Sequence, residues 1–150
     1  MNRSVQYGDN ELDARVEMLI DIGVSPNWLR TGYRYFPYAA WQSYQWWVLR
    51  ANYCFPEHDL VTLFIGSRAV ADITAADEDT RPLVASIAAL DPILPFRKRE
   101  IPAMPDGLAE SAVSGVAAYV SHGSEFDPAD LCDLCEFAER DPYERDSRGG

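Results

Sequence analysis

Apolar and polar positions alternate with a period of two over residues 46–55. One set is Trp47, Leu49, Ala51, Tyr53 and Phe55, and the other is Trp46, Val48, Arg50, Asn52 and Cys54. Successive side chains of a strand point to opposite faces of a sheet, so this pattern predicts a β-strand. Because large apolar side chains occur in both sets, we expect both faces of the strand to be at least partly covered.

Residues 38–45, which precede this segment, are open to a second interpretation. Tyr38, Trp41, Tyr44 and Val48 fall near helical spacing, and neither Gly nor Pro interrupts residues 38–55. These features are typical of a helix that begins at Pro37. A helix that ends near Gln45 and is followed by a strand would satisfy both patterns.

Two further strands are predicted after this one. Residues 56–59 read as a hairpin loop, residues 60–65 as a strand, and residues 68–73 as its partner. Gly66 and Ser67 between the two strands are residue types that suit a tight two-residue turn. These strands predict an antiparallel meander at the centre of the fold.

Helices are predicted where capping residues flank apolar stripes. They cover about residues 10–23, 80–90, 108–120 and 127–140. We therefore expect one α+β domain over residues 1–140, in which a small antiparallel β-meander of about three to five strands packs against about four helices. Residues 91–107 are rich in proline and predict a long exposed loop or an inserted arm. Residues 141–150 are expected to form a disordered acidic tail.

The charge balance narrows the classes of partner. Of 150 residues, 24 are Asp or Glu and 13 are Lys or Arg, which gives a net charge of −11. This charge opposes direct binding to nucleic acid and to anionic membranes, and it favours a basic protein partner. No apolar segment approaches the roughly 20 residues that span a bilayer, and no apolar h-region of a signal peptide occurs near Met1. The expected location is the cytoplasm.

An aromatic tract over residues 28–55 is the first candidate site. It holds eleven of the eighteen aromatic residues, and no Asp or Glu occurs between Gly23 and Pro56. Trp, Tyr and Arg are the residue types enriched at the hot spots of protein interfaces, although a core also absorbs aromatic side chains. The predicted partner-binding residues are Trp28, Tyr33, Tyr35, Trp41, Trp46, Trp47 and Arg50.

A metal site is the second candidate. Cys132 and Cys135 are spaced to chelate a soft metal, and Cys54 with His58 could supply the other half of a tetrahedral Cys₃His zinc site. The alternative is that the cysteines pack as small apolar side chains, Cys132 and Cys135 on a helix face and Cys54 in the sheet. Apart from zinc, no cofactor is indicated.

The favoured function is a non-enzymatic binding protein that inhibits or regulates a basic partner, in the manner of an immunity protein that neutralises a toxin. The chain has no Gly-rich phosphate loop, no G-x-S-x-G, no H-E-x-x-H and no EF-hand loop. One alternative is a zinc- or thiol-dependent enzyme that uses the Cys₃His set. Another is an acidic mimic of DNA that occupies a nucleic-acid-binding protein.

Metal analysis of the purified protein tests the zinc alternative. If the Cys₃His set binds zinc, the protein carries one equivalent of the metal, and Cys132→Ala loses it because a ligand is removed. Zinc-free protein would eliminate this alternative.

Overall fold

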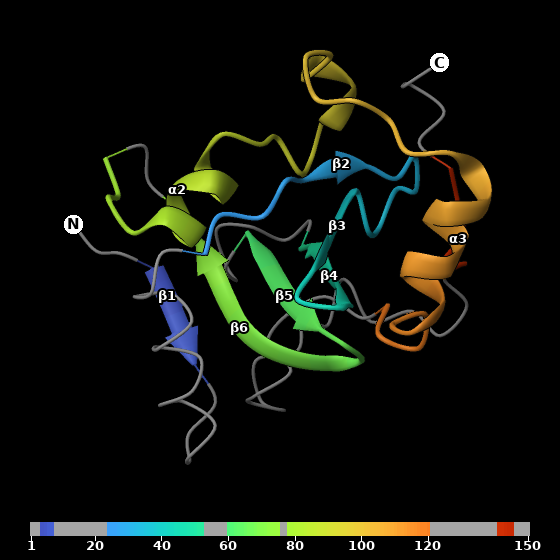
Figure 1. The fold of residues 1–150 in the computed structure, drawn as a ribbon, viewed down its shortest axis with the longest axis horizontal. Helices are drawn as coiled ribbons and strands as arrows, with labels where there is room; N and C mark the ends of the chain where they lie inside the picture. The colour runs from blue at the N-terminus through green and yellow to red at the C-terminus, as the bar shows by residue number, and fades with distance from the viewer. Residues whose placement is uncertain (1–3, 8–23, 53–59, 76–77, 121–140, 146–150) are drawn as a thin grey trace.

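The structure is a computed structural model that describes residues 4–7, 24–52, 60–75, 78–120 and 141–145. The described strands form one antiparallel sheet with the order β1-β6-β5-β4-β3-β2 (Figure 1). The strands are β1 (Ser4–Tyr7), β2 (Leu29–Arg30), β3 (Tyr38–Gln42), β4 (Gln45–Ala51), β5 (Val61–Ile65) and β6 (Arg68–Thr74). Strands β2 to β6 are neighbours in chain order and form a five-strand meander, to which β1 adds at the β6 edge.

The predicted α+β class and the antiparallel meander are confirmed. Residues 38–42 form strand β3, which pairs with β4 from Tyr38 opposite Leu49 to Gln42 opposite Gln45. The helical alternative for this segment is therefore wrong. Packing decides the outcome, because the strand lets alternate side chains fill the cores on both faces of the sheet, whereas a helix would leave β4 without its neighbour.

The described residues contain two α-helices rather than the predicted four. They are α2 (Pro82–Ala88) and α3 (Asp106–Ser114). The helices predicted over residues 10–23 and 127–140 lie outside the described residues. Helix α3 ends earlier than predicted, since residues 115–118, which begin with Gly115, form turns.

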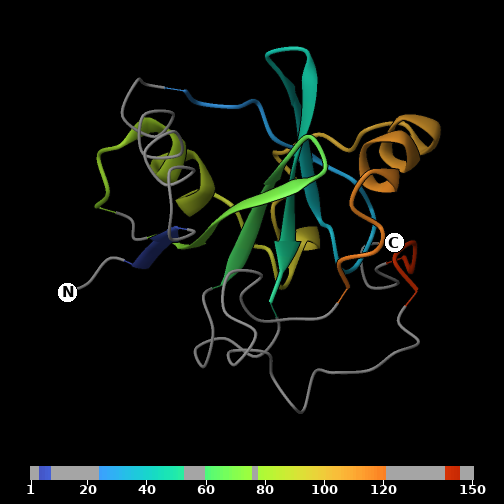
Figure 2. The same ribbon diagram turned by 90° about the horizontal axis from the view of Figure 1, so that it is seen from below.

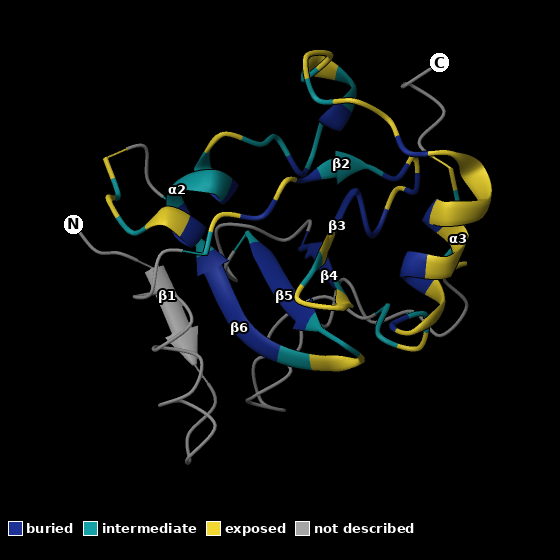
Figure 3. Cartoon of the chain, viewed as in Figure 1, coloured by how far each residue is buried: buried dark blue, intermediate teal, exposed yellow. Residues whose placement is uncertain are grey.

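The two helices cover opposite faces of the sheet (Figure 2). On one face, α2 packs against alternate residues of the central strands, in a core that includes Leu49, Leu63 and Ile73. On the other face, α3 packs over a core that includes Val48 and Phe64. Figure 3 shows strands β3 to β6 buried along most of their length, whereas the outer side of α3 is exposed. The two-sided cover predicted for β4 is present.

Residues 91–104 pack against the sheet instead of extending from it as an arm. A short 3₁₀ helix, η1 (Pro95–Arg97), lies in this segment, and Pro92, Pro95 and Met104 are buried. The backbone of Arg30 in β2 makes two bonds with this segment: its amide donates to the carbonyl of Pro102 at 2.8 Å, and its carbonyl accepts from the amide of Met104 at 2.9 Å. These bonds cover the free edge of β2.

A row of buried polar side chains crosses the face of the sheet that α3 covers. Arg50, Thr62 and Asp72 stand opposite one another on β4, β5 and β6. The Thr62 hydroxyl donates to Oδ1 of Asp72 at 2.8 Å and accepts from Nη2 of Arg50 and Nδ2 of Asn52, both at 3.1 Å. One donor and two acceptor positions exhaust a hydroxyl group, so Thr62 connects the row with its full bonding capacity. The row fixes the register of three strands.

The substitution Thr62→Val tests this row, because it keeps the shape of the side chain and removes the hydroxyl. Buried donors on Arg50 and Asn52 lose an acceptor, so we expect the free energy of unfolding to fall by about 2–3 kcal/mol. Chemical denaturation measures this change. Thr80→Val, at an exposed threonine, is the control and should change stability by less than about 0.5 kcal/mol. Equal effects of the two substitutions would contradict the proposed role of the row.

No described helix is long and apolar enough to cross a membrane.

Candidate partner-binding site

The β3–β4 hairpin ends in a turn with an unusual backbone. Ser43 and Tyr44 are the two loop residues, and their φ angles are 55° and 65°. Two consecutive positive φ angles are those of a type I′ turn, whose twist matches that of the flanking strands. Asn and Gly are the residues preferred at these positions, whereas a bulky side chain in this region of φ is an outlier.

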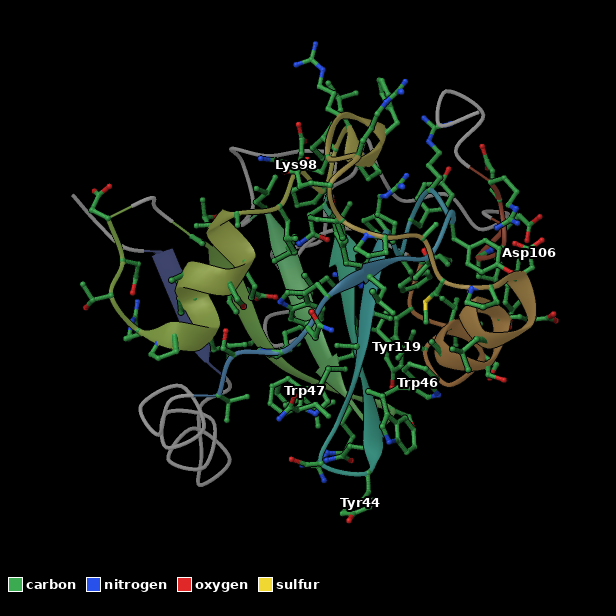
Figure 4. The ribbon with its side chains drawn as sticks, turned by 45° about the horizontal axis from the view of Figure 1, so that its top comes forward. Tyr44, Trp46, Trp47, Lys98, Asp106 and Tyr119 are labelled. Carbon is green, nitrogen blue, oxygen red and sulfur yellow. The ribbon has the colours of Figure 1, made fainter. Side chains whose placement is uncertain are left out.

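The side chains at this tip face solvent. Tyr44 is 92% exposed and Trp41 is 58% exposed, while Trp46 is partly buried. Figure 4 shows Tyr44 pointing away from the end of the hairpin, with Trp46 on one side of β4 and Trp47 on the other. We call Trp41, Tyr44 and Trp46 the aromatic tip.

The two tryptophans of the tip hold each other in place. Trp41 and Trp46 are directly opposite across β3 and β4, and their ring centroids are 5.0 Å apart at an interplanar angle of 74°. Edge-to-face pairs of this kind contribute about 0.5–1.5 kcal/mol beyond the area that they bury. The carbonyl of Trp46 also accepts a 3.0 Å bond from the amide of Gly66 in the neighbouring turn. The tip is therefore ordered before any partner arrives.

The strands that carry the tip and the neighbouring β5–β6 turn contain no negatively charged residue. Residues 24–52 and 60–71 contain no Asp or Glu, although the whole chain carries 24 carboxylates. The polar residues of the hairpin end are Gln42, Ser43 and Gln45, which are neutral. An uncharged aromatic centre is the composition found at the middle of protein interfaces, where charged residues are depleted.

The strain at Tyr44 points to a role other than folding. A non-glycine residue in the left-handed region raises the energy by about 1 kcal/mol or more. The ring returns almost none of this energy through packing, because it is nearly fully exposed. Residues that break a local rule without a structural gain are typical of functional positions.

The other predicted partner-binding residues are placed differently from the tip. Trp28, Tyr33, Tyr35, Trp47 and Arg50 are all buried. Trp28 donates from its indole nitrogen to Oγ of Ser86 in α2 at 2.9 Å. Of the seven predicted residues, the structure brings only Trp41 and Trp46 together at the surface.

Tyr44 was missed by the sequence-based prediction, although a signal for it exists. The two residues between Gln42 and Gln45 separate segments that both suit strands, which is the spacing of a two-residue hairpin. Ser-Tyr is not among the residue pairs that mark such a turn. Recognition of Tyr44 therefore depended on first assigning residues 38–42 to a strand.

Two tyrosines inside the fold have raised pKa values. Burial raises the pKa of Tyr38 to about 12, which keeps its hydroxyl protonated next to the backbone of Asp91, with 3.3 Å to both the amide and the carbonyl. Burial also raises the pKa of Tyr33, and the guanidinium of Arg145 opposes that rise. Both groups are neutral at physiological pH, so neither supplies a base for catalysis.

The candidate metal ligands Cys54, His58, Cys132 and Cys135 lie outside the described residues, and the zinc site stays a prediction. In the part of the chain that the structure describes, no group of three or more His, Cys, Asp or Glu side chains could hold a metal ion.

Comparison with known proteins identifies no relative of this chain. No protein-family model, no curated protein and no solved structure matches the chain. The physical properties of the aromatic tip therefore carry the functional interpretation.

Replacement of Ser43-Tyr44 by Asn-Gly tests the strain at the turn. Because Asn and Gly adopt positive φ readily, we expect the double substitution to stabilise the protein by about 1 kcal/mol, as measured by chemical denaturation. Tyr44→Ala is the matched control, since it removes the ring and keeps a non-glycine residue in the strained position. Its stability should stay within about 0.5 kcal/mol of wild type. A large loss in Tyr44→Ala would show that the ring supports the fold.

Proposed function

We propose that this chain is a non-enzymatic binding protein that inhibits or regulates a basic protein partner by inserting its aromatic tip into an apolar pocket of that partner. The observation that carries the proposal is Tyr44, exposed and strained at the end of a hairpin stiffened by the Trp41–Trp46 pair. Rigid aromatic side chains give a large contact area at a low cost in conformational entropy.

The shape of the tip favours a macromolecular partner over a small ligand. Small-molecule sites are concave and enclose most of their ligand. A two-residue turn that carries exposed rings is convex, so it fits into a pocket of another molecule and does not surround one. A rigid projection that enters a pocket is a common way for an inhibitor to block a partner, and buried aromatic side chains supply most of the affinity in such complexes.

The charge of the chain and the neutrality of the tip suit different stages of association. A net charge of −11 attracts a basic partner and raises the association rate. The uncharged tip loses little hydration energy when it is buried, so it suits the centre of the contact. The proposal therefore assigns steering to the carboxylates and affinity to the rings.

Affinity capture with matched variants tests this function. Wild-type protein, Tyr44→Ala and the Asn-Gly turn variant are immobilised, and the recovered proteins are identified and then purified for measurement of Kd. We expect a basic protein that both variants bind at least about tenfold more weakly, since loss of an aromatic hot spot removes 2 kcal/mol or so. Leu108→Ala, on the exposed side of α3 at 45% exposure, is the control and should bind like wild type.

Two outcomes would contradict the proposal. One is equal recovery of every bound protein by wild type and both tip variants. The other is binding of the tip to lipid instead of to a protein, because Trp and Tyr also favour membrane interfaces. Sedimentation with phosphatidylcholine vesicles tests this case. Tyr44-dependent binding to the vesicles, with no protein partner recovered, would show that the target of the tip is a membrane.

A further inference from the structure

Residues 141–145, here called the strap, lie across a surface formed by distant parts of the chain. That surface, the Tyr33 surface, consists of residues 31–34 and Asp106 at the start of α3. The strap begins as a turn, in which the amide of Glu144 donates to the carbonyl of Asp141 at 3.0 Å, and Arg145 after the turn forms an isolated antiparallel bridge with Tyr33. The amide of Arg34 donates to the carbonyl of Glu144 at 2.7 Å. The strap thus docks through its backbone as well as its side chains.

Arg145 makes three different contacts with the Tyr33 surface. Its guanidinium lies over the ring of Tyr33, 4.9 Å from the centroid. Nη2 donates to Oδ1 of Asp106 at 2.6 Å, and Nη1 donates to the carbonyl of Thr31 at 3.4 Å. The planar guanidinium thus contacts a ring face, a carboxylate and a carbonyl. This combination suits Arg rather than Lys.

Gly32 shapes the surface for this guanidinium. A Cβ at position 32 would lie 2.7 Å from Nη1 of Arg145, and the φ of Gly32 is +83°. The backbone conformation therefore favours glycine, and a Cβ here would displace the guanidinium of Arg145. The position that faces the arginine is built for close approach.

Tyr143 supplies the apolar part of the contact. Its ring meets the ring of Tyr33 edge to face, with 5.5 Å between centroids. Tyr143 is partly buried against the core beneath α3, and Tyr33 is only 7% exposed. The surface therefore recognises three features of a turn-forming segment: an aromatic ring, a backbone carbonyl and an arginine two residues after the ring.

The two described ion pairs of the strap are individually weak. The side chains of the Arg34–Glu144 pair are 45% and 41% exposed, and those of the Arg145–Asp106 pair are 46% and 83% exposed. Exposed ion pairs contribute about 0–1 kcal/mol each and weaken with salt. Segments with few buried apolar contacts open at a lower free energy than the whole fold. The strap is the kind of element that a competing segment can replace.

We propose that the Tyr33 surface is a binding site for a turn-forming, arginine-bearing segment of a partner protein, and that Tyr143, Glu144 and Arg145 occupy this site in cis. The partner's segment presents an aromatic residue and an arginine with the spacing seen in the strap. An acidic chain with a net charge of −11 attracts such a basic segment. The site is separate from the aromatic tip and does not depend on the proposed function.

A peptide with the sequence of the strap tests the site in trans. The peptide is acetyl-Asp-Pro-Tyr-Glu-Arg-amide, and the receptor is the full chain with Tyr143→Ala and Arg145→Ala, which frees the Tyr33 surface. We expect a saturable NMR shift of the Arg34 amide, because that amide donates a hydrogen bond to the carbonyl of the glutamate. Wild type should require at least about tenfold more peptide, since its own strap competes at an effective concentration on the order of millimolar.

Matched changes separate recognition from nonspecific attraction. A peptide with Ala in place of Arg should bind about tenfold more weakly, because it loses an ion pair and a cation–π contact. Asp106→Asn in the receptor should weaken the parent peptide severalfold and leave the Ala peptide unchanged. If the double variant does not fold, Arg145→Ala alone serves as the receptor, since it keeps the packing of Tyr143. Equal binding of the two peptides, equal binding to wild type and variant, or no saturable shift would overturn the proposal.

Discussion

The structure depends on covering both faces of one antiparallel sheet. The strands carry apolar side chains at odd and even positions alike, so each face needs a partner layer to exclude water. Helix α2 supplies part of one layer and α3 part of the other. This requirement places Trp47 and Trp28 in one core and Tyr33, Tyr35 and Phe64 in the other. The aromatic tip is exposed because the hairpin end extends beyond these layers (Figure 2).

The same requirement explains what could be predicted from the sequence. Alternation over residues 46–55 predicted strand β4 and its two covered faces, and Gly66-Ser67 predicted the β5–β6 turn, because these signals are local. Residues 38–45 were ambiguous, since their aromatic residues fall near helical spacing while no Gly or Pro separates them from the alternating segment. Pairing with β4 decides in favour of a strand, and no local pattern contains that information.

For a related reason, the sequence could not predict which individual aromatic residues are exposed. Trp46 and Trp47 are adjacent and chemically identical, yet Trp47 is 1% exposed while Trp46 reaches the surface. The two side chains lie on opposite faces of the sheet, and only the layer over Trp47 covers the whole ring. Likewise, Arg50 resembles an interface arginine in composition, but its contacts with Asn52 and Thr62 make it a buried connector of strands. Contacts between residues 31–34 and 141–145 span more than a hundred positions, and nothing in either segment alone indicates the other.

The aromatic tip and the Tyr33 surface lie on the same side of the sheet. Trp46 and Tyr33 both border the core that α3 covers, and strand β3, five residues long, separates the tip from the loop of Tyr33. At about 3.3 Å per residue, that separation is roughly 17 Å, which is within the span of an interface of ordinary size. A partner that engages both sites meets different resistance at each. The tip is already ordered and needs no rearrangement, whereas the strap must first be displaced, so contact at the tip would hold the partner near the strap and raise the effective concentration of its arginine there.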